Sequence, residues 1–462
     1  MKIIFKIILK LQEKKMPNEI ERHTKAEQIR SVIRYIKRFN NAVIVIYIDD
    51  EIIDSPLFSS HIRDISLIHQ AGLNVVIIPG ARNHIDRILS EANISWEIKN
   101  SCRVTTPDAM QLIKTAAFET SNIIMTSLAG EHLTAVIGNW VRARGKGVID
   151  GFDYGSAGEI DKLEIDSIKT VLEKGFIPIF PCIGWSLTGK PYNISSMQLA
   201  EEIAIYLKAD KLFYIVPQAE ITKDNFIIPE TTGLSEEGCI PALSIAELNQ
   251  FIDLNINNPA KNETTEKILF LLSLAKEACN KGVRRSHILN GHSDGVIPCE
   301  IFSDLGSGTM IHTNSYGNIR EMKIEDIPGV LRVIRPYVQK GILLPRSDEQ
   351  LLSELNDFIV YELDGGIRAC AALHIFDDNQ GEIAALAVDS SCSHIGIGPQ
   401  IMSHLIDKAR KMNLSSVFVL TTQTADWFEN IGFKPDSIET LPEKRKKLWT
   451  PNRNSKLFRI IF

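Results

Sequence analysis

Short apolar runs alternate with amphipathic segments along the first two thirds of the chain. Ala42–Ile48 has the sequence AVIVIYI and Leu73–Ile78 has LNVVII, and the apolar spacing over His61–Ala71 between them is helical. Runs that are apolar at every position predict strands buried on both faces, and the strand–helix–strand order predicts a parallel crossover. We therefore predict an α/β fold with a doubly wound sheet. The other segments with these patterns are Ile29–Phe39 (helix) and Leu133–Val141, Gly175–Ile183 and Lys211–Val216 (strands).

The pattern changes after a polar stretch. His312–Asn318 (HTNSYGN) contains glycine and has no periodicity, which indicates an interdomain linker. Beyond it, Asp357–Glu362, Ala369–Phe376 and Glu382–Val388 predict strands of a largely antiparallel sheet, followed by a glycine-containing loop and a long amphipathic helix. We expect an N-terminal extension over residues 1–28, one domain over 29–314 and a second, α+β domain over 315–462.

Composition narrows the class of protein. The 462 residues are 44% hydrophobic and 23% charged with a net charge of −6, which is typical of a globular protein and disfavours a nucleic-acid partner. The seven cysteines show no CxxC spacing, so we expect neither a metal site nor the disulfide framework of a secreted protein. We expect reduced thiols in a cytoplasmic protein. Met1–Leu11 is apolar but is interrupted by Lys6 and Lys10 and is too short to span a bilayer, so we expect no membrane segment.

A glycine loop lies between the strand Glu382–Val388 and the following helix. Gly396 and Gly398 at a helix start would leave backbone N–H groups exposed where the helix dipole is positive, which suits a pyrophosphate. A glycine loop before a helix more often only forms a turn, so the residues alone leave open both a pyrophosphate site and a plain turn.

This strand, loop and helix resemble the acetyl-CoA site of the GNAT acyltransferases, and Thr424–Phe433 (TADWFENIGF) is similar to their closing helix and strand. Arg335–Leu351, Phe418–Thr422 and Leu441–Lys456 resemble the C-terminal domain of bacterial N-acetylglutamate synthases. The resemblance implies an N-acetyltransferase that moves the acetyl group of acetyl-CoA to the amino group of L-glutamate in the first step of arginine biosynthesis. The cofactor-binding residues it implies are Leu386, Val388, Ser393, His394, Ile395, Gly396, Ile397 and Gly398.

Acetyl transfer to an amine needs a proton acceptor and a donor for the developing oxyanion. The family has a glutamate at the position of Glu382, so we assign Glu382 as general base, acting through water, and a backbone N–H near Leu386 as oxyanion donor. Arg346, Arg453 and Ser455 match family positions that hold the substrate, whose carboxylates suit bidentate arginines. Without the resemblance, Glu382 would be a solvated strand-end carboxylate and the arginines would be surface charges.

Three positions depart from the acetyltransferase pattern. Ser393 replaces a basic residue at the start of the pyrophosphate loop, Gln423 stands where arginine is common, and Phe428 replaces a tyrosine that often protonates the thiolate. We expect these departures to lower activity without changing the reaction.

Residues 29–311 resemble the amino acid kinase fold of acetylglutamate kinase. The matching landmarks are Pro79–Asp86, Arg103–Thr105, Gly138, Asn139 and Tyr192–Asn193. A working kinase carries a lysine and then a glycine pair on its first strand, where this chain has Tyr47, Asp49 and Asp50, and Met197 replaces an aspartate. Carboxylates where phosphates would bind disfavour phosphoryl transfer.

In the synthases this kinase-like domain is similar to a sensor for L-arginine. The resemblance implies that His287 flanks the ligand, that Glu300 pairs with its guanidinium and that the Gly306 loop approaches its backbone; the alternative is that Glu300 pairs locally. The resemblance also implies a homo-oligomer. Two rival functions stay open: a phosphotransferase that acts on an acylated amino acid, and a non-catalytic arginine-binding protein with a decayed acetyltransferase half.

Overall fold

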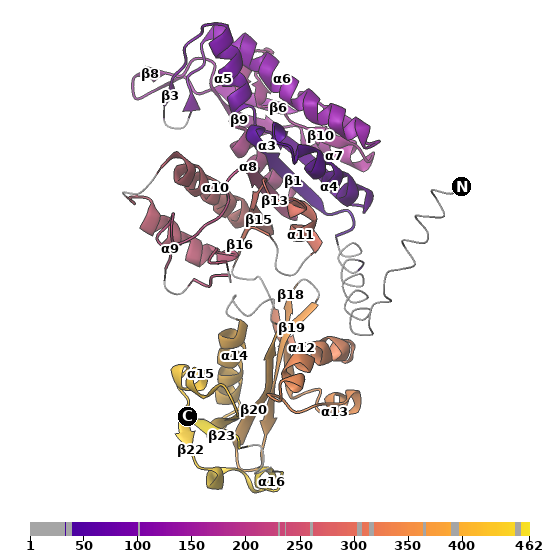
Figure 1. Cartoon of the computed structure of the whole chain (residues 1–462), viewed down its shortest axis with the longest axis vertical. Coiled ribbons are helices and arrows are strands. Elements are labelled where there is room, and N and C mark those ends of the chain that lie inside the picture. Colours follow the sequence, from indigo (N-terminus) through magenta and orange to yellow (C-terminus); the bar gives the residue numbers. More distant parts are fainter. Residues whose placement is uncertain are drawn as a thin grey trace, which may run out of the picture. The chain divides into compact units, whose positions relative to one another are not determined.

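The computed structural model describes most of the chain as two compact units. Its residues up to Pro229 and from Leu243 to His312 form unit 1, and those from Glu230 to Ala242 and from Thr313 to Phe462 form unit 2. Figure 1 shows the elements of each. The described residues are 33, 39–99, 102–229, 232–235, 237–258, 262–302, 307–313, 318–363, 366–389, 397–448 and 454–462. The helix expected over Ile29–Phe39 therefore lies largely outside them.

The main sheet of unit 1 has eight strands in the order β14-β16-β15-β13-β1-β2-β10-β5. β1 pairs in parallel with β2 and β13, and the parallel arrangement continues to β15 on one side and to β10 and β5 on the other. β16 runs antiparallel to β15. This confirms the predicted parallel α/β sheet. The strands are β1 (Val43–Ile48), β2 (Asn74–Pro79), β5 (Ala135–Ile137), β10 (Ile177–Ile179), β13 (Lys211–Val216), β14 (Ala242–Ser244), β15 (Arg285–Asn290) and β16 (Thr309–His312).

Helices cover this sheet on both faces, which explains why β1 is buried at every position after its first. α4 (Phe58–Gln70), α6 (Pro107–Gly130) and α11 (Val296–Phe302) share one core with alternate residues of β1, β2 and β13. α8 (Ser196–Leu207) packs on the same three strands, and α10 (Glu263–Asn280) packs on β15 and β16. In the parts of the chain that the structure describes, no helix is both long and apolar enough to cross a bilayer.

A smaller sheet and several short elements complete unit 1. Four strands lie in the order β12-β11-β6-β9, with β6 and β9 antiparallel. The bounds are α3 (Asp50–Ile53), α5 (Arg82–Glu91), α7 (Ile165–Glu173), α9 (Ile245–Asn255), β3 (Ile98–Lys99), β4 (Cys102–Arg103), β6 (Val141–Gly145), β7 (Val148–Ile149), β8 (Phe152–Asp153), β9 (Gly158–Leu163), β11 (Ile183–Trp185) and β12 (Pro191–Asn193).

Unit 2 is built on a seven-stranded sheet in the order β17-β18-β19-β20-β21-β23-β22. All neighbours are antiparallel except β20 and β21, which are parallel. The predicted strands are present, although β20 begins two residues earlier than predicted because Gln380 and Gly381 already pair with β21. The strands are β17 (Asn318–Glu321), β18 (Phe358–Leu363), β19 (Gly366–Ile375), β20 (Gln380–Val388), β21 (Ser416–Thr421), β22 (Lys434–Asp436) and β23 (Lys456–Ile461). The predicted linker is shorter at both ends, since His312 ends β16 and Asn318 begins β17.

The two faces of this sheet carry different helices. α12 (Ile327–Gln339) and α13 (Asp348–Ser353) pack on Phe358, Cys370 and Ala372, and we call this side the α12 face. α14 (Ile397–Lys411) and α15 (Ala425–Asn430) pack on the side of Ile383 and Val417, the α14 face. The remaining short helices are η1 (Ile324–Asp326), η3 (Ile438–Thr440) and α16 (Glu443–Lys446).

The ladder between β20 and β21 is incomplete. Gln380–Glu382 pair with Ser416–Phe418, but no pairs follow although β20 continues to Val388 and β21 to Thr421. Two strand edges inside the sheet therefore offer backbone groups to a ligand rather than to each other.

A β-bulge lies in the same part of β20. Cys370 pairs with Ala387 and Ala372 with Ala384, so Ala385 and Leu386 together oppose one residue of β19. Ala385 has a φ of 53°, a left-handed conformation that alanine rarely adopts. A bulge redirects backbone groups away from the ladder, and such irregularities are common beside active sites.

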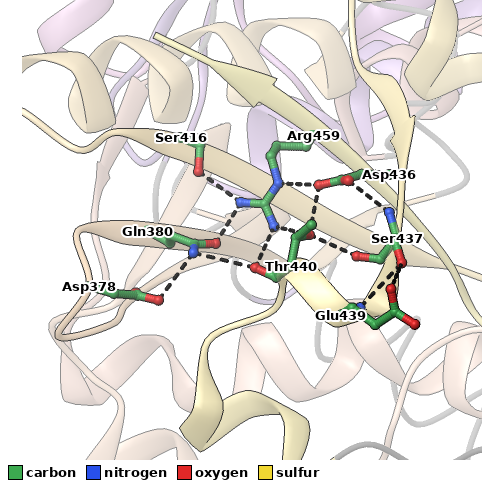
Figure 2. Close-up of polar contacts among 8 residues, drawn as sticks. All are labelled: Asp378, Gln380, Ser416, Asp436, Ser437, Glu439, Thr440 and Arg459. Atoms are coloured by element: carbon green, nitrogen blue, oxygen red, sulfur yellow. Dashed lines mark hydrogen bonds and ion pairs between the residues drawn. The ribbon is translucent and has the colours of Figure 1, made fainter.

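Buried Arg459 holds the paired end of these strands together. Its guanidinium donates to Asp436, to Gln380 and Ser416, and to Thr440 (Figure 2). It also lies over the ring of Phe418. Burial alone would raise the pKa of Asp436, but hydrogen bonds from Arg459, Thr440 and the amide of Ser437 hold it below its ordinary value. One side chain thus ties the starts of β20 and β21 to β22, β23 and η3.

We predict that Arg459→Met destabilises unit 2 by about 3 kcal/mol, because it leaves Asp436 without its counter-ion and several acceptors without a donor. Arg459→Lys should recover part of the loss, since lysine keeps the charge but not the planar set of donors. Scanning calorimetry measures the change. Arg410→Met is the matched control, because the ion pair of Arg410 with Asp407 is exposed and worth less than about 1 kcal/mol; equal losses in both variants would contradict the role of Arg459.

Candidate active site

The predicted base, Glu382, is buried on the α12 face and paired with an arginine. Arg445 Nε donates to Glu382 Oε2 at 2.6 Å and Arg445 Nη2 donates to Oε1 at 3.1 Å, a bidentate contact across 63 residues of sequence. Such charge-assisted pairs fix the carboxylate in one orientation. Glu382 is therefore not the solvated strand-end carboxylate of the alternative interpretation.

A histidine lies opposite Glu382 on the neighbouring strand. His374 of β19 is the direct partner of Glu382 in the ladder, and directly opposed side chains share a face with Cβ atoms about 5 Å apart. His374 Nδ1 lies 2.7 Å from Asp357 Oδ2. The next partner along the same line is Phe418 of β21, followed by Arg459 of β23. We call this line of four residues, His374–Glu382–Phe418–Arg459, the central rung.

Predicted substrate residue Arg346 also lies at the α12 face. Its Nε is 3.5 Å from Glu354 Oε2, and its guanidinium lies over the ring of Phe358 at 5.6 Å. Burial raises the pKa of Cys370 on β19 to about 12, and the nearby charge of Arg346 opposes that shift. Arg346 and Arg445 are thus each paired with a carboxylate of the chain. Ser455 directly precedes β23, whereas Arg453 lies outside the described residues.

The predicted cofactor residues fall in three places. Leu386 lies in the bulge of β20, and Val388, at the strand end, accepts a hydrogen bond from Tyr337 of α12 through its carbonyl at 2.6 Å. Ile397 and Gly398 form the first turn of α14, where a Cβ on Gly398 would approach Trp427 at 3.5 Å. Ser393, His394, Ile395 and Gly396 lie outside the described residues. The unpaired edge of β20 suits the amide groups of a nucleotide thioester, and the N-terminus of α14 suits its phosphates.

The departures from the acetyltransferase pattern occupy distinct environments. Phe428 is buried in an aromatic cluster with Trp427 and Phe433, at ring centroid distances of 5.0 and 5.7 Å. Gln423 lies in the turn after β21, where its backbone N–H donates to Thr421 Oγ1. Thr421 Oγ1 is also 2.8 Å from Thr424 Oγ1. Phe428 therefore contributes to the core and offers no proton.

The end of β1 in unit 1 carries the buried carboxylates of Asp49 and Asp50. Asp49 accepts from Lys267 Nζ at 2.6 Å and from Tyr47 Oη at 3.0 Å. Asp50 accepts from the backbone amide of Asn83 in the first turn of α5. Burial and the neighbouring Asp49 raise the pKa of Asp50 from 3.8 to about 6. A carboxylate of the chain itself therefore binds the helix N-terminus where the kinase fold would receive a phosphate.

The predicted arginine residues His287 and Glu300 are buried and paired with each other. His287 Nδ1 lies 2.6 Å from Glu300 Oε1, while Glu300 Oε2 accepts from the amides of Ser307 at 2.6 Å and Gly308 at 3.2 Å. Burial lowers the pKa of His287 to about 4, so the ring is neutral at pH 7. Burial would raise the pKa of Glu300, but His287, Lys211 and the Ser307 amide outweigh it and lower the pKa. Gly306 lies outside the described residues.

Sequence reasoning missed the partners of the predicted residues. Arg445 lies in the basic run LPEKRKK, which contributed to the resemblance without indicating which cation reaches Glu382. His374 had a weak signal, since it follows Cys370 and Ala372 at the two-residue spacing of one strand face. Lys267 and the bulge at Ala385 had none. Among the described residues, no group of three or more His, Cys, Asp or Glu side chains is placed to hold a metal ion.

Two protein families match the two halves of the chain. A model of the amino acid kinase family matches residues 25–290, and a model of the acetyltransferase (GNAT) family matches residues 332–433. The chain is 34% identical over 449 residues to the amino-acid acetyltransferase of Yersinia pestis, covering 95% of this chain and 98% of that protein. The amino-acid acetyltransferase of Yersinia pseudotuberculosis matches with the same identity and coverage.

Solved structures agree with the family models. N-acetylglutamate synthase from Neisseria gonorrhoeae complexed with coenzyme A and L-arginine matches with a TM-score of 0.77 and 30% identity, covering 95% of this chain and 99% of that chain. The same enzyme complexed with coenzyme A and N-acetyl-glutamate matches with a TM-score of 0.58 and 32% identity, covering 94% and 99%. The chain therefore belongs to the N-acetylglutamate synthase family of amino-acid acetyltransferases and is an acyltransferase with an amino-acid-kinase-like domain followed by a GNAT domain.

Proposed function

We propose that the chain transfers the acetyl group of acetyl-CoA to the amino group of L-glutamate, forming N-acetyl-L-glutamate and CoA in the first step of arginine biosynthesis. The observation that carries the proposal is the buried Glu382, fixed by Arg445 beside the point where the β20–β21 ladder ends. The complexes of the Neisseria gonorrhoeae synthase with coenzyme A and N-acetyl-glutamate support the same substrates.

The acetyl donor fits the unpaired edges of the sheet. Amides of the pantetheine arm would pair with the free edge of β20 as an added strand does, and the diphosphate would lie at the N-terminus of α14. The bulge at Ala385 and Leu386 then supplies a backbone N–H for the thioester oxygen, whose negative charge grows as the amine attacks.

The acceptor would bind on the α12 face. Arg346, with Arg453 and Ser455, is proposed to hold the glutamate carboxylates, because a planar guanidinium binds a carboxylate with two parallel hydrogen bonds. Glu382 acts as the general base by polarising the water molecule through which the ammonium proton leaves. Its two oxygens retain lone pairs beyond those that Arg445 occupies, so the bidentate pair fixes this carboxylate without blocking it.

The rival phosphotransferase is disfavoured by the geometry of unit 1. Gly80 lies so close to β1 that a Cβ would be 2.9 Å from Tyr47 Oη and 3.0 Å from the amide of Asp50. Asp50 already binds the amide of Asn83, and Asp49 holds Lys267. An incoming phosphate would meet two carboxylates and find its helix N-terminus occupied.

We infer that unit 1 instead senses L-arginine, the pathway's end product, through His287, Glu300 and the Gly306 loop. The arginine complex of the Neisseria gonorrhoeae synthase supports this role. Glu300 keeps its charge while buried, and a buried carboxylate is a strong partner for a guanidinium. Binding would require Glu300 to exchange or share its contacts with His287, Ser307 and Gly308. Assembly into a homo-oligomer is part of the same proposal.

Glu382→Gln tests the acetyltransferase assignment. We expect release of CoA thiol from acetyl-CoA to depend on glutamate in the natural protein, and the variant to reduce turnover about 100-fold or more because it removes the general base. Calorimetric titration should show acetyl-CoA affinity within about twofold of the natural protein. No glutamate-dependent release, together with no heat of acetyl-CoA binding in the natural protein, would instead support the decayed binding protein.

Glu300→Gln tests the arginine site. We expect arginine to inhibit acetyl transfer by the natural protein, and the variant to need at least about tenfold more arginine because it loses about 1.4 kcal/mol or more of charge-assisted contact. Glu277→Gln, which alters a carboxylate on α10 that is paired with Lys281, is the control and should keep the response of the natural protein. An unchanged arginine response in Glu300→Gln would remove this residue from the site.

The pH dependence of stability in Asp50→Asn tests whether a buried carboxylate occupies the N-terminus of α5. Because the pKa of Asp50 is raised to about 6 in the folded protein, its contribution to stability is fully present below about pH 4 and is lost as pH rises through about 6. The variant should therefore be more stable than the natural protein at pH 8, by up to about 3 kcal/mol, with the advantage vanishing near pH 4. Thermal unfolding at several pH values measures it; a difference that does not vary with pH would contradict the buried charge.

A further inference from the structure

His374 is a titratable side chain beside the proposed base to which the proposed reaction assigns no role. It is the ladder partner of Glu382, so both side chains project from the α12 face at neighbouring positions. The side chain of His374 is 21% exposed, which leaves it a route for exchanging protons with solvent. Its ring packs edge-on against Phe358, with 6.5 Å between ring centroids.

Asp357 fixes how this ring is used. With Nδ1 2.7 Å from Asp357 Oδ2, we assign the Nδ1–H tautomer, in which Nδ1 donates to the carboxylate. The other nitrogen, Nε2, then carries the lone pair and is the proton acceptor. A carboxylate behind the ring also stabilises the imidazolium that forms when Nε2 gains a proton.

Glu382 is a poor final site for the proton. Both of its oxygens already accept hydrogen bonds from Arg445, at 2.6 and 3.1 Å. A proton that stayed on Glu382 would cancel the charge that makes this pair strong and would leave the guanidinium without its counter-ion. A proton on His374, in contrast, forms an imidazolium that has Asp357 as its counter-ion.

Resting on the proposed function, we propose that His374, oriented by Asp357, is the final acceptor of the proton that the substrate ammonium group loses to the water held by Glu382. The ammonium N–H bond breaks and the proton passes through that water to Nε2. The neutral amine then forms the C–N bond with the thioester carbonyl carbon, and the tetrahedral intermediate collapses with cleavage of the C–S bond. The second amine proton leaves with the CoA thiolate as thiol, and the imidazolium returns its proton to solvent, so one proton is released per acetyl group.

The charged groups around His374 in the described part of unit 2 are consistent with this role. Asp357 contacts it from the loop before β18, Glu382 faces it from β20, and Arg445 of α16 is paired with Glu382. Both carboxylates are opposite in charge to an imidazolium, and the arginine is paired with Glu382.

The test is the pH dependence of kcat/KM for glutamate in His374→Gln and Asp357→Asn. In the natural protein kcat/KM should rise with pH on the acid side of the profile, because the proton acceptor must be deprotonated to act. We call this rise the acid limb. His374→Gln should lower kcat about 100-fold and lose that limb, with KM for acetyl-CoA within about twofold. Asp357→Asn keeps a hydrogen-bond acceptor for Nδ1 but removes the counter-ion of the imidazolium, so its kcat should fall and its pH profile should differ from that of the natural protein. Imidazole added to His374→Ala should restore part of the activity.

Control variants and the natural protein distinguish the outcomes. His404→Gln changes an exposed histidine of α14 and should keep the natural profile. If His374→Gln unfolds at a lower temperature than the natural protein, Asp357→Asn carries the test, because the side chain of Asp357 is 41% exposed. An active natural protein with superimposable profiles in both variants would overturn the role of His374 alone. A natural protein that acetylates no glutamate would overturn the proposed function itself.

Discussion

The end of the β20–β21 ladder is the constraint on which the acetyltransferase unit depends. Arg459 secures the paired residues Gln380 and Ser416 at one end, while the bulge at Ala385 disturbs β20 on the other side of Glu382. On β20, Glu382 lies between these two features and belongs to the central rung, in which His374, Glu382, Phe418 and Arg459 follow one another across four strands. The two strands are therefore paired where Glu382 is held and unpaired beyond it, where we propose that the thioester enters.

The hydrogen bonds of Arg459 also reach the segment that carries Arg445, the arginine that orients Glu382. Arg459 donates to Thr440 in η3, and Arg445 follows five positions later in α16. A single buried guanidinium thus fixes both the strand that carries the carboxylate and the segment that carries its partner. Unit 1 neutralises its buried carboxylates in a comparable way, with Lys267 on Asp49, a helix amide on Asp50, and His287 with two amides on Glu300. In both units these buried charged groups already have partners among the described residues, so a ligand that bound to them would exchange or share those partners.

The sequence predicts the fold better than it predicts the site. β1, β2 and β13 follow from apolar runs because each is buried on both faces, and the family resemblance led directly to Glu382. The pairing of Glu382 with Arg445 spans 63 residues and depends on where η3 and α16 fall after folding, which no local pattern encodes. His374 becomes a neighbour of Glu382 only through the strand register. The bulge has no sequence signal either, because alanine occupies a left-handed position where glycine or asparagine would have indicated it.

A crystal structure with coenzyme A and N-acetyl-L-glutamate bound would test the central claim most directly. We expect the acetamide carbon beside Ala385 and Leu386, its nitrogen on the α12 face within one water molecule of Glu382, and the ligand carboxylates on Arg346 and Arg453. A ligand bound on the α14 face, or away from the central rung, would contradict it.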